Sequence, residues 1–332
     1  MRGYTMRTPD INRLLAAFRH EATDSVPNFE IVIGARALTR LLGVATDKSL
    51  WDLAPELRAK ALAAVGQDAM PCPLHARIPN ASVRSAEDAE RMQFPDPNQA
   101  RERLEACLKA VAGTRLGVCA CITGPLTSAY MVLGPVSIES FMYLLYDDPG
   151  LAARLMDRFV DHYTAVIAAV ADLPFQFYYI GDDVGGSAGT LIGPQHLAEL
   201  WAPRARRLVD AAHETGRPVL FHCCGDQSAV LPYLVEWGVE AVHPLQPPVN
   251  DIYVVHRQYG DRLALVGNIN VGGVLSFGTP DAVRRDTREH LERLAGNGGY
   301  VCGSSHSIID SVPPENYLAM VETVQEYGDT SK

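Results

Sequence analysis

The stretch from residue 194 to 224, PQHLAELWAPRARRLVDAAHETGRPVLFHCC, contains the unit that decides the fold. Proline at its first position and Gly216 just beyond its last periodic residue predict a helix over Pro194–Glu214. The next residues, Pro218–Cys224, form a short apolar run without polar alternation, which is typical of a strand covered on both faces. A helix followed closely by a buried strand is the repeating unit of an α/β protein.

The same alternation recurs along almost the whole chain. Eight short strands alternating with helices in 332 residues favour a (β/α)8 TIM barrel over an open doubly wound sheet, since no G-x-G-x-x-G follows the first strand. We therefore predict one TIM-barrel domain over residues 1–332, with residues 1–25 as a helical lead-in. The other predicted strands are Phe29–Gly34, Ala63–Met70, Leu116–Thr123, Gln176–Asp182, Glu240–His243, Leu263–Gly267 and Gly299–Cys302, and the other helices are Leu151–Ala171, Ala282–Leu294 and Pro314–Tyr327.

Composition excludes several classes of partner. The chain is 47% hydrophobic with a formal net charge of −10, and no run of lysine or arginine exceeds two residues. Nucleic acid and anionic membrane are therefore not expected partners. No apolar run approaches the ~20 residues that a membrane span needs, and the N-terminus does not read as a secretory signal. Seven scattered cysteines indicate a reducing, cytoplasmic compartment.

Polar residues follow most of the predicted strands. In a TIM barrel the chemistry lies where the strands end and the βα loops begin, so these side chains are expected to converge on one mouth. They are Asp182, Asp183, the His222–Cys224 run, His243, Asn268, Asn270, Cys302 and His306, with Glu30 inside the first strand.

The His222–Cys223–Cys224 run offers the most specific chemistry. Side chains alternate along a strand, so His222 and Cys224 face one way and Cys223 the other. An imidazole and a thiolate aimed at one point suit Zn²⁺. Adjacent cysteines lack the spacer of a redox pair, and buried packing is the alternative because free cysteine is commonly buried. A third ligand is offered by Cys302 or His306 in GGYVCGSSHSI, residues 298–308.

Three acids are further candidates. Asp182 and Asp183 in IGDDVGG, residues 180–186, are adjacent, so at most one faces the mouth in regular strand geometry. Each is either a contact to metal, substrate or proton, or a helix-capping or loop-turn residue. Glu30 sits in an apolar strand, where an unpaired charge is costly. It is therefore either paired, for instance with Arg36, or used at the site.

Between about Val26 and Gly328 six segments stand out: VPNFE, IGDDVGG, IGPQHLAELWAPRARRLVDAAHETGRPVLFHCCGD, GVEAVHPLQP, YGDRLALVGNIN and VPPENYLAM. In these segments the chain resembles the uroporphyrinogen decarboxylase superfamily. The segment EIVIGARALTR, residues 30–40, lacks the arginine-rich clamp of true decarboxylases, whereas H-x-C on the fifth strand is similar to the zinc-dependent corrinoid methyltransferase branch. That branch includes methylcobamide:coenzyme M methyltransferases and O-demethylase components.

The resemblance implies a zinc ligand set. His222 and Cys224 match its first two members. Counting back from PPEN, the position of the third, a cysteine in that branch, is occupied by His306, with Cys302 in reserve. Asp182, Asp183 or Glu30 would then position the substrate or deliver a proton, and a fourth, acidic ligand such as Glu30 or Asp183 is compatible with this set.

The implied activity is transfer of a methyl group between a small substrate, a methoxy compound or a thiol, and the cobalt of a separate corrinoid protein. No D-x-H-x-x-G segment is present, so we expect cobalamin on that partner, with a homodimer as a possible assembly. The alternatives are a metal-free decarboxylase or lyase of the same fold, and a metal- or corrinoid-binding protein without turnover.

Overall fold

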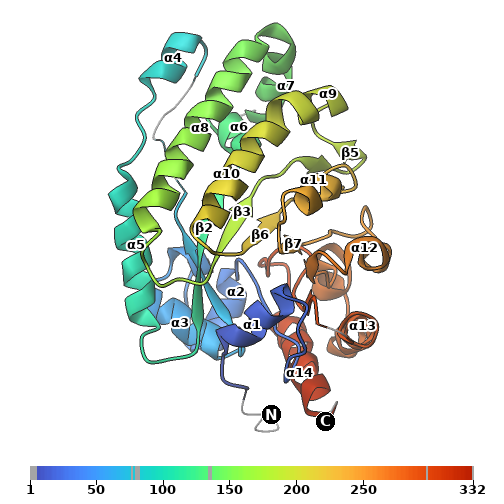
Figure 1. Ribbon diagram of the computed structural model, residues 1–332. Coiled ribbons are helices and arrows are strands. Elements are labelled where there is room, and N and C mark those ends of the chain that lie inside the picture. Colours follow the sequence, from blue (N-terminus) through green and yellow to red (C-terminus); the bar gives the residue numbers. More distant parts are fainter. Residues whose placement is uncertain (1–5, 76–77, 79–82, 134–136, 297, 331–332) are drawn as a thin grey trace. The chain divides into compact units, whose positions relative to one another are not determined.

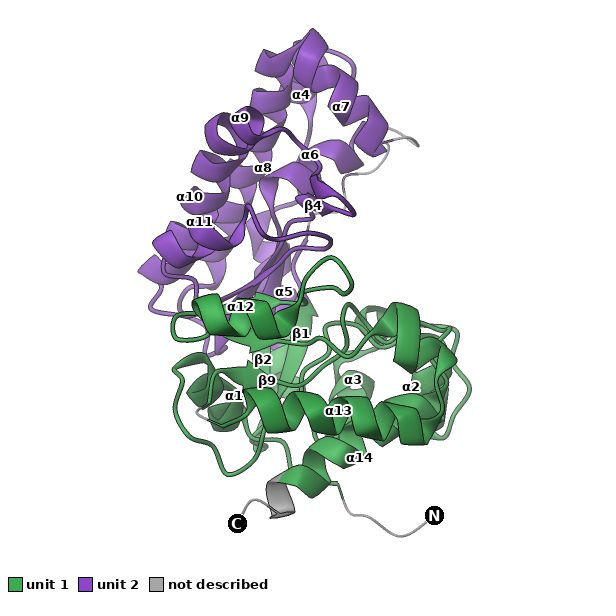
Figure 2. Cartoon of the chain, turned by 90° about the vertical axis from the view of Figure 1, so that its right-hand side faces the viewer, with its two compact units in different colours: residues 1–72, 106–119, 240–332 green, residues 73–105, 120–239 purple. Residues whose placement is uncertain are grey.

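The computed structural model describes residues 6–75, 78, 83–133, 137–296 and 298–330. The chain divides into two compact units, each assembled from separate stretches of sequence (Figure 2). Unit 1 comprises residues 1–72, 106–119 and 240–332, and unit 2 comprises residues 73–105 and 120–239. Helix α1 (Ile11–Phe18) lies in the predicted lead-in. One domain over the whole chain stays a prediction.

Unit 2 is built on parallel strands. β3 (Phe177–Gly181) pairs with β6 (Val219–His222), and the register sets Gly181 opposite His222. β2 (Gly117–Thr123) neighbours β3 on its other edge. Every residue of β6 is buried, as its non-alternating apolar sequence predicts. A small antiparallel hairpin, β4 (Gly185–Gly186) with β5 (Gly189–Thr190), follows β3.

Helices α8 (Pro149–Val170) and α10 (Ala202–Glu214) lie side by side in unit 2 (Figure 1). The first confirms the predicted helix at Leu151–Ala171. The helix predicted over Pro194–Glu214 is present but interrupted, because a π-helical turn at Leu197–Trp201 separates α9 from α10. The remaining helices of this unit are α4 (Ala86–Arg91), α5 (Pro97–Ala110, which continues into unit 1), α6 (Pro125–Met131), α7 (Ser137–Asp147), α9 (Pro194–His196) and α11 (Leu231–Glu236).

Unit 1 contains a second run of parallel strands, in which β8 pairs with β7 on one side and β9 on the other. The predicted helices over residues 282–294 and 314–327 are confirmed as α13 and α14. The strands are β1 (Ala69–Pro73), β7 (Ala241–His243), β8 (Ala264–Val266) and β9 (Tyr300–Val301). The helices are α2 (Ala35–Leu42), α3 (Pro55–Ala63), α12 (Ile252–Tyr259), α13 (Pro280–Leu294) and α14 (Pro314–Thr330), with a 3₁₀ turn at Leu50–Asp52 and a π turn at Val271–Leu275.

Two predicted strands differ from the structure. Ala63–Met70 was placed too early, because α3 continues to Ala63 and β1 begins at Ala69. The segment predicted as the strand Phe29–Gly34 makes only isolated parallel bridges, at Asn28 to Cys302 and at Ile33 to Ile308. The Gln67 side chain takes the place of a regular ladder beside this segment.

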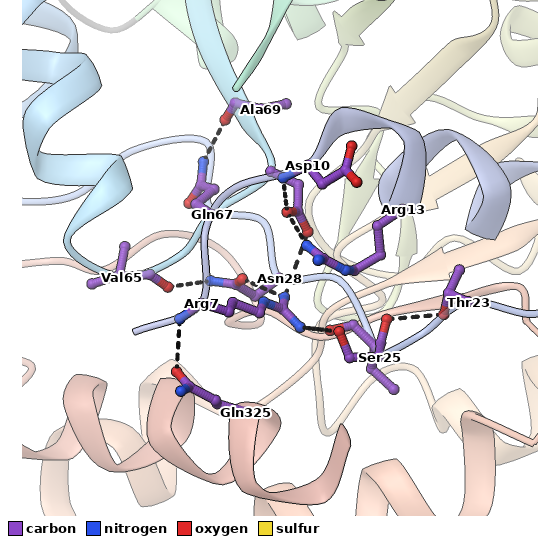
Figure 3. A network of polar contacts seen from close by, with 12 residues as sticks. Arg7, Asp10, Arg13, Thr23, Ser25, Asn28, Val65, Gln67, Ala69 and Gln325 are labelled. Atoms are coloured by element: carbon purple, nitrogen blue, oxygen red, sulfur yellow. Dashed lines mark hydrogen bonds and ion pairs between the residues drawn. The ribbon is translucent and has the colours of Figure 1, made fainter. Parts of the chain in front are cut away.

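Gln67 joins this bridged segment to β1. The Gln67 side chain accepts a hydrogen bond from the backbone N–H of Glu30 at 3.0 Å and donates to the backbone oxygens of Glu30 at 2.9 Å and Ala69 at 2.8 Å. Gln67 is fully buried, and Figure 3 shows its bond to Ala69. A single amide therefore satisfies backbone groups that a neighbouring strand would otherwise pair.

Around this amide, the lead-in is fastened by arginines (Figure 3). Arg7 donates to Ser25 and Asn28, and Arg13 forms an ion pair of 2.5 Å with the fully buried carboxylate of Asp68. The lead-in is thus part of the packed core of unit 1.

Along the described part of the chain the parallel strands alternate with helices, which confirms the predicted TIM-barrel-like α/β class. Among the described residues, no helix is long and apolar enough to span a membrane.

Candidate metal centre

The end of β6 carries the first two predicted ligands. His222 is the last residue of the strand, and Cys224 follows two positions later. The Nε2 atom of His222 lies 3.3 Å from the Sγ atom of Cys224. Cys223 is fully buried, and its Sγ accepts a hydrogen bond from the N–H of Gly185 at 3.3 Å. Cys223 is therefore committed to packing, while the His222–Cys224 pair forms one N/S donor site.

Asp183 completes this group within unit 2. Because Gly181 pairs with His222, the end of β3 runs beside the end of β6. The Oδ1 atom of Asp183 lies 3.4 Å from His222 Nε2 and accepts the backbone N–H of Cys224 at 3.0 Å. One ligand atom from each of Asp183, His222 and Cys224 lies within 4.8 Å of the others. The three side chains can bind one ion together.

The electrostatics of this group favour a bound cation. Burial raises the pKa of Cys224 well above its ordinary value, and the negative charge of Asp183 raises it further. Burial alone would also raise the pKa of Asp183, but a hydrogen bond and the charge of His222, with the N–H of Cys224, hold it well below its usual range. A thiolate beside a buried carboxylate is costly without a positive charge. Nitrogen, sulfur and oxygen donors at this spacing fit Zn²⁺.

A glycine contact holds the loop that carries Cys224. A Cβ atom on Gly185 would lie 2.4 Å from the backbone oxygen of Cys224, so only glycine fits there. The N–H of Asp226 donates to the oxygen of Gly186 at 2.8 Å. The β4–β5 hairpin, which follows Asp183 directly, therefore packs its backbone against the Cys224 loop.

The carboxylate of Asp182 binds to α6 and Trp201 rather than to the Asp183–His222–Cys224 group. This carboxylate accepts hydrogen bonds from the backbone N–H of Thr127 at 2.7 Å and Leu126 at 3.3 Å, and from Nε1 of Trp201 at 2.8 Å. Burial raises its pKa to about 6, although these hydrogen bonds oppose the shift. Asp182 thus caps the start of α6, which is the capping alternative of the sequence analysis.

Sequence reasoning missed the residues that α6 and β3 contribute near this group. Thr127 Oγ1 accepts the backbone N–H of Asp183 at 2.8 Å. Burial raises the pKa of Tyr130 to about 12, and the charges of Asp183 and Cys224 add to this shift. The Tyr179 ring lies 5.5 Å from the His222 ring. The polar segment GPLTSAY, directly after the strand predicted at Leu116–Thr123, was the signal available for the first two.

Glu30 belongs to unit 1 and is fully buried. Its carboxyl group accepts the backbone N–H of Ser304 at 2.7 Å and the Ser304 hydroxyl at 2.6 Å. The suggested pairing with Arg36 was wrong, because Ser304 is the partner and the N–H of Arg36 donates to Asp310. Burial raises the pKa of Glu30 to about 8, which makes it a carboxylic acid rather than a carboxylate near neutrality.

His306 and Cys302 also belong to unit 1. His306 is exposed in the segment after β9, whereas Cys302 is fully buried. Burial raises the pKa of Cys302 to about 12, so this thiol does not ionise readily. His306 as a metal ligand stays a prediction.

Comparison with known proteins gives the family. The model of the family "Uroporphyrinogen decarboxylase (URO-D)" matches residues 68–327. A uroporphyrinogen decarboxylase of Methylococcus capsulatus is 29% identical over 74% of this chain and 70% of its own length. A methylated-thiol–coenzyme M methyltransferase of Methanosarcina mazei is 26% identical over 71% of this chain and 62% of its own length.

A solved structure supports the fold. A methyltransferase from Methanosarcina mazei superposes with a TM-score of 0.73, covering 96% of this chain and 99% of its own, at 21% sequence identity. The predicted resemblance is confirmed, with methyltransferases among both the sequence relatives and the structural neighbours. The chain belongs to the uroporphyrinogen decarboxylase family.

Proposed function

We propose that this protein is a zinc-dependent methyltransferase, which moves a methyl group between a small substrate and the cobalt of a separate corrinoid protein. The observation that carries the proposal is the convergence of Asp183, His222 and Cys224 at the ends of two adjacent strands. The similarity to a methylated-thiol–coenzyme M methyltransferase supports the reaction class.

Each residue has a distinct task in holding the ion. Cys224 must lose its proton when the metal binds, and the raised pKa of its thiol means that loading should become easier as pH rises. Asp183 is already ionised, because His222 and the N–H of Cys224 stabilise its charge. Three protein ligands match a catalytic zinc site, which keeps one position for substrate.

When bound, zinc would supply Lewis-acid chemistry at the heteroatom of the substrate, an ether oxygen or a thiol sulfur. The protein's own groups orient that substrate. Tyr130 on α6, whose pKa is raised by burial and by the charges of Asp183 and Cys224, is our candidate hydrogen-bond donor to that substrate. Asp182 holds the start of α6 and so fixes Thr127, which in turn holds the backbone of Asp183. We infer that Asp182 is a positioning residue and Asp183 a ligand.

The test combines metal analysis with an anaerobic assay. Purified wild type, Asp183→Ala, His222→Ala, Cys224→Ala and His306→Ala would be measured for zinc content and for methylation of Co(I) cobalamin by methoxy and methylthio compounds. Cys223→Ala is the matched control, since it removes a neighbouring thiol on the opposite face. We expect zinc to fall at least tenfold in His222→Ala and Cys224→Ala and to remain in Cys223→Ala.

The His306→Ala variant decides whether His306 is also a protein ligand. Loss of zinc there would add His306 to the ligand set, and retention of zinc would assign the protein ligands to unit 2 alone. Full zinc occupancy in both His222→Ala and Cys224→Ala would refute the site. Activity that survives zinc removal would refute the mechanism and favour the metal-free decarboxylase or lyase, and bound zinc without methyl transfer to cobalamin would favour a binding protein.

A further inference from the structure

His290 on α13 is a buried histidine of unit 1, with 8% of its surface exposed. Both of its ring nitrogens lie at hydrogen-bond distance from an oxygen atom. The Nδ1 atom is 2.8 Å from the backbone oxygen of Asp286, four residues earlier on the same helix. The Nε2 atom is 3.0 Å from the Oδ1 atom of Asn268, which follows β8. These two contacts determine which ring nitrogens carry a proton.

Neither partner donates a proton to the ring. A backbone carbonyl only accepts, so Nδ1 of His290 must carry a hydrogen. The orientation of the Asn268 amide is fixed by its other contact, in which Nδ2 donates to the backbone oxygen of Leu245 at 2.5 Å. Turning this amide over would bring two acceptor oxygens together, so Oδ1 faces His290 and Nε2 must carry a hydrogen as well. A ring with two N–H donors is the positively charged imidazolium.

Asp286 also supplies the counter-charge of this imidazolium. Its Oδ2 atom lies 3.8 Å from Nδ1 of His290, and this oxygen is buried without a hydrogen-bond partner in the described part of the chain. A buried carboxylate oxygen without a partner is costly unless a positive charge lies close to it. Burial raises the pKa of Asp286, and the charge of His290 acts against this shift. The backbone oxygen and the carboxylate of Asp286 therefore both favour the charged ring.

The aromatic groups around His290 on other elements are uncharged near neutrality. Tyr253 of α12 has its ring centroid 5.4 Å from that of His290. Tyr300 of β9 interacts electrostatically with Asp286, and burial raises the pKa of Tyr300 well above its ordinary value. Charged side chains of α13 and α14 form pairs of their own, Glu289 with Arg293 and Arg284 with Glu322, each at 2.7 Å. The charge of His290 is therefore balanced by Asp286.

Through Asn268, His290 is connected to the β7–α12 loop (residues 244–251) of unit 1. Leu245, whose backbone oxygen accepts from Asn268, has a φ of 54°, a left-handed conformation that leucine rarely adopts. Such backbone strain persists only where the surrounding contacts hold it. A Cβ atom on Gly267 would lie 2.7 Å from the backbone oxygen of Pro244, so the residues after β7 and β8 pack backbone against backbone. In a TIM barrel the chemistry lies at these carboxyl ends of the strands.

We propose that His290 is a proton-dependent positioning residue of the β7–α12 loop. As an imidazolium it orients the Asn268 amide, and the oriented amide holds the strained backbone at Leu245. Loss of one ring proton leaves a bare nitrogen facing an acceptor oxygen, so one of the two contacts of His290 becomes repulsive. The loop should therefore loosen as pH rises and His290 becomes neutral.

Nitrogen-15 NMR of the histidine rings measures the protonation state. The chain contains ten histidines, and comparison with the spectrum of His290→Gln identifies the His290 signals. We expect both ring nitrogens of His290 to carry protons at about pH 7, where an ordinary histidine is mostly neutral. Asp286→Asn removes the counter-charge but keeps the backbone oxygen, and it should make His290 lose this proton at lower pH. A neutral His290 ring in the folded wild type at about pH 7 would overturn the proposal.

Hydrogen exchange followed by mass spectrometry measures the loop. At about pH 7 residues 244–251 should exchange about tenfold faster or more in His290→Gln than in wild type, because a hydrogen bond to a charged group is lost. Asn268→Asp should speed the same exchange while His290 keeps both protons, because a carboxylate oxygen then faces the Leu245 carbonyl. Glu292→Gln, an exposed position on α13, is the matched control and should leave the loop unchanged.

The wild type itself covers the case in which a variant does not fold. After correction for intrinsic exchange rates, residues 244–251 should lose protection over the pH range in which NMR shows His290 losing its proton. Loop protection that does not follow this titration would overturn the proposal. Unchanged exchange in both His290→Gln and Asn268→Asp, or an equal increase in every peptide of unit 1, would also overturn it. Neither experiment involves zinc or methyl transfer, so the outcome is independent of the proposed function.

Discussion

Replacing Glu30 by glutamine should change the pH dependence of stability rather than stability at every pH. Burial raises the pKa of Glu30 from 4.5 to about 8 in the folded chain. The folded state therefore holds this proton more tightly than the unfolded state does, and stability declines as pH rises from 4.5 through 8. The shift corresponds to roughly 3–5 kcal/mol of unfolding free energy lost once Glu30 is ionised. Above that range the loss is constant.

Glutamine removes this titration but keeps the contacts. Its amide oxygen can accept the N–H of Ser304, and its amide N–H can donate to the Ser304 hydroxyl. Glu30→Gln and wild type should thus be similar at about pH 5 and differ by roughly 3–5 kcal/mol at about pH 9, with the variant the more stable.

Urea unfolding at a series of pH values measures the difference. Glu102→Gln, an exposed position on α5, controls for the general effect of removing one negative charge. Wild-type and Glu30→Gln curves that run parallel from about pH 5 to about pH 9 would refute the reasoning, because they would show that Glu30 titrates alike in both states.

Three further variants test the packing that supports the fold, each by urea unfolding near neutral pH. Gln67→Leu should lower the free energy of unfolding by about 3 kcal/mol or more, because it leaves backbone groups of Glu30 and Ala69 without hydrogen-bond partners in the core. A loss below about 1 kcal/mol would contradict the role of the Gln67 amide. Asp68→Ala should cost about 2–3 kcal/mol, since Arg13 loses its 2.5 Å partner and keeps only its ion pair with the exposed Asp24, and a neutral effect would show that water replaces the carboxylate. Trp201→Phe should cost about 1–3 kcal/mol through the lost donor to the buried Asp182 carboxylate, in addition to the loss of packing, and only the hydrogen-bond part should shrink as Asp182 becomes protonated below about pH 6.

The sequence was most informative where side-chain burial is uniform. β3 and β6 are continuous apolar runs, and the helices next to them have clear start and stop signals. The sequence therefore predicts both strands where the structure has them. The His222–Cys224 pair followed from strand alternation alone, and the structure places the two ligand atoms 3.3 Å apart. Local periodicity fixes such features without reference to distant parts of the chain.

Features that depend on one distant side chain were not predictable. The segment at residues 28–33 is apolar, which predicts a strand. In the structure, hydrogen bonds of the Gln67 side chain link this segment to β1 in place of a backbone ladder. Nothing in the local pattern distinguishes an amide that replaces a ladder from an ordinary buried glutamine. Likewise, Arg36 is close to Glu30 in sequence, yet the partner is Ser304, 274 positions away.

The third metal ligand shows the same limit at the level of function. Counting from a family motif pointed to His306, because the motif records where a cysteine stands in relatives. Strand register points to Asp183. Because Gly181 pairs with His222, the residues after β3 lie beside the residues after β6, and Asp183 accepts the N–H of Cys224. Strand alternation allows either Asp182 or Asp183 to face the site, and their contacts distinguish the two. Asp182 accepts three hydrogen bonds from α6 and Trp201. The Oδ1 atom of Asp183 instead contacts His222 and accepts the N–H of Cys224. A carboxylate whose charge is stabilised by the two residues that we propose as the other ligands is placed to be the third.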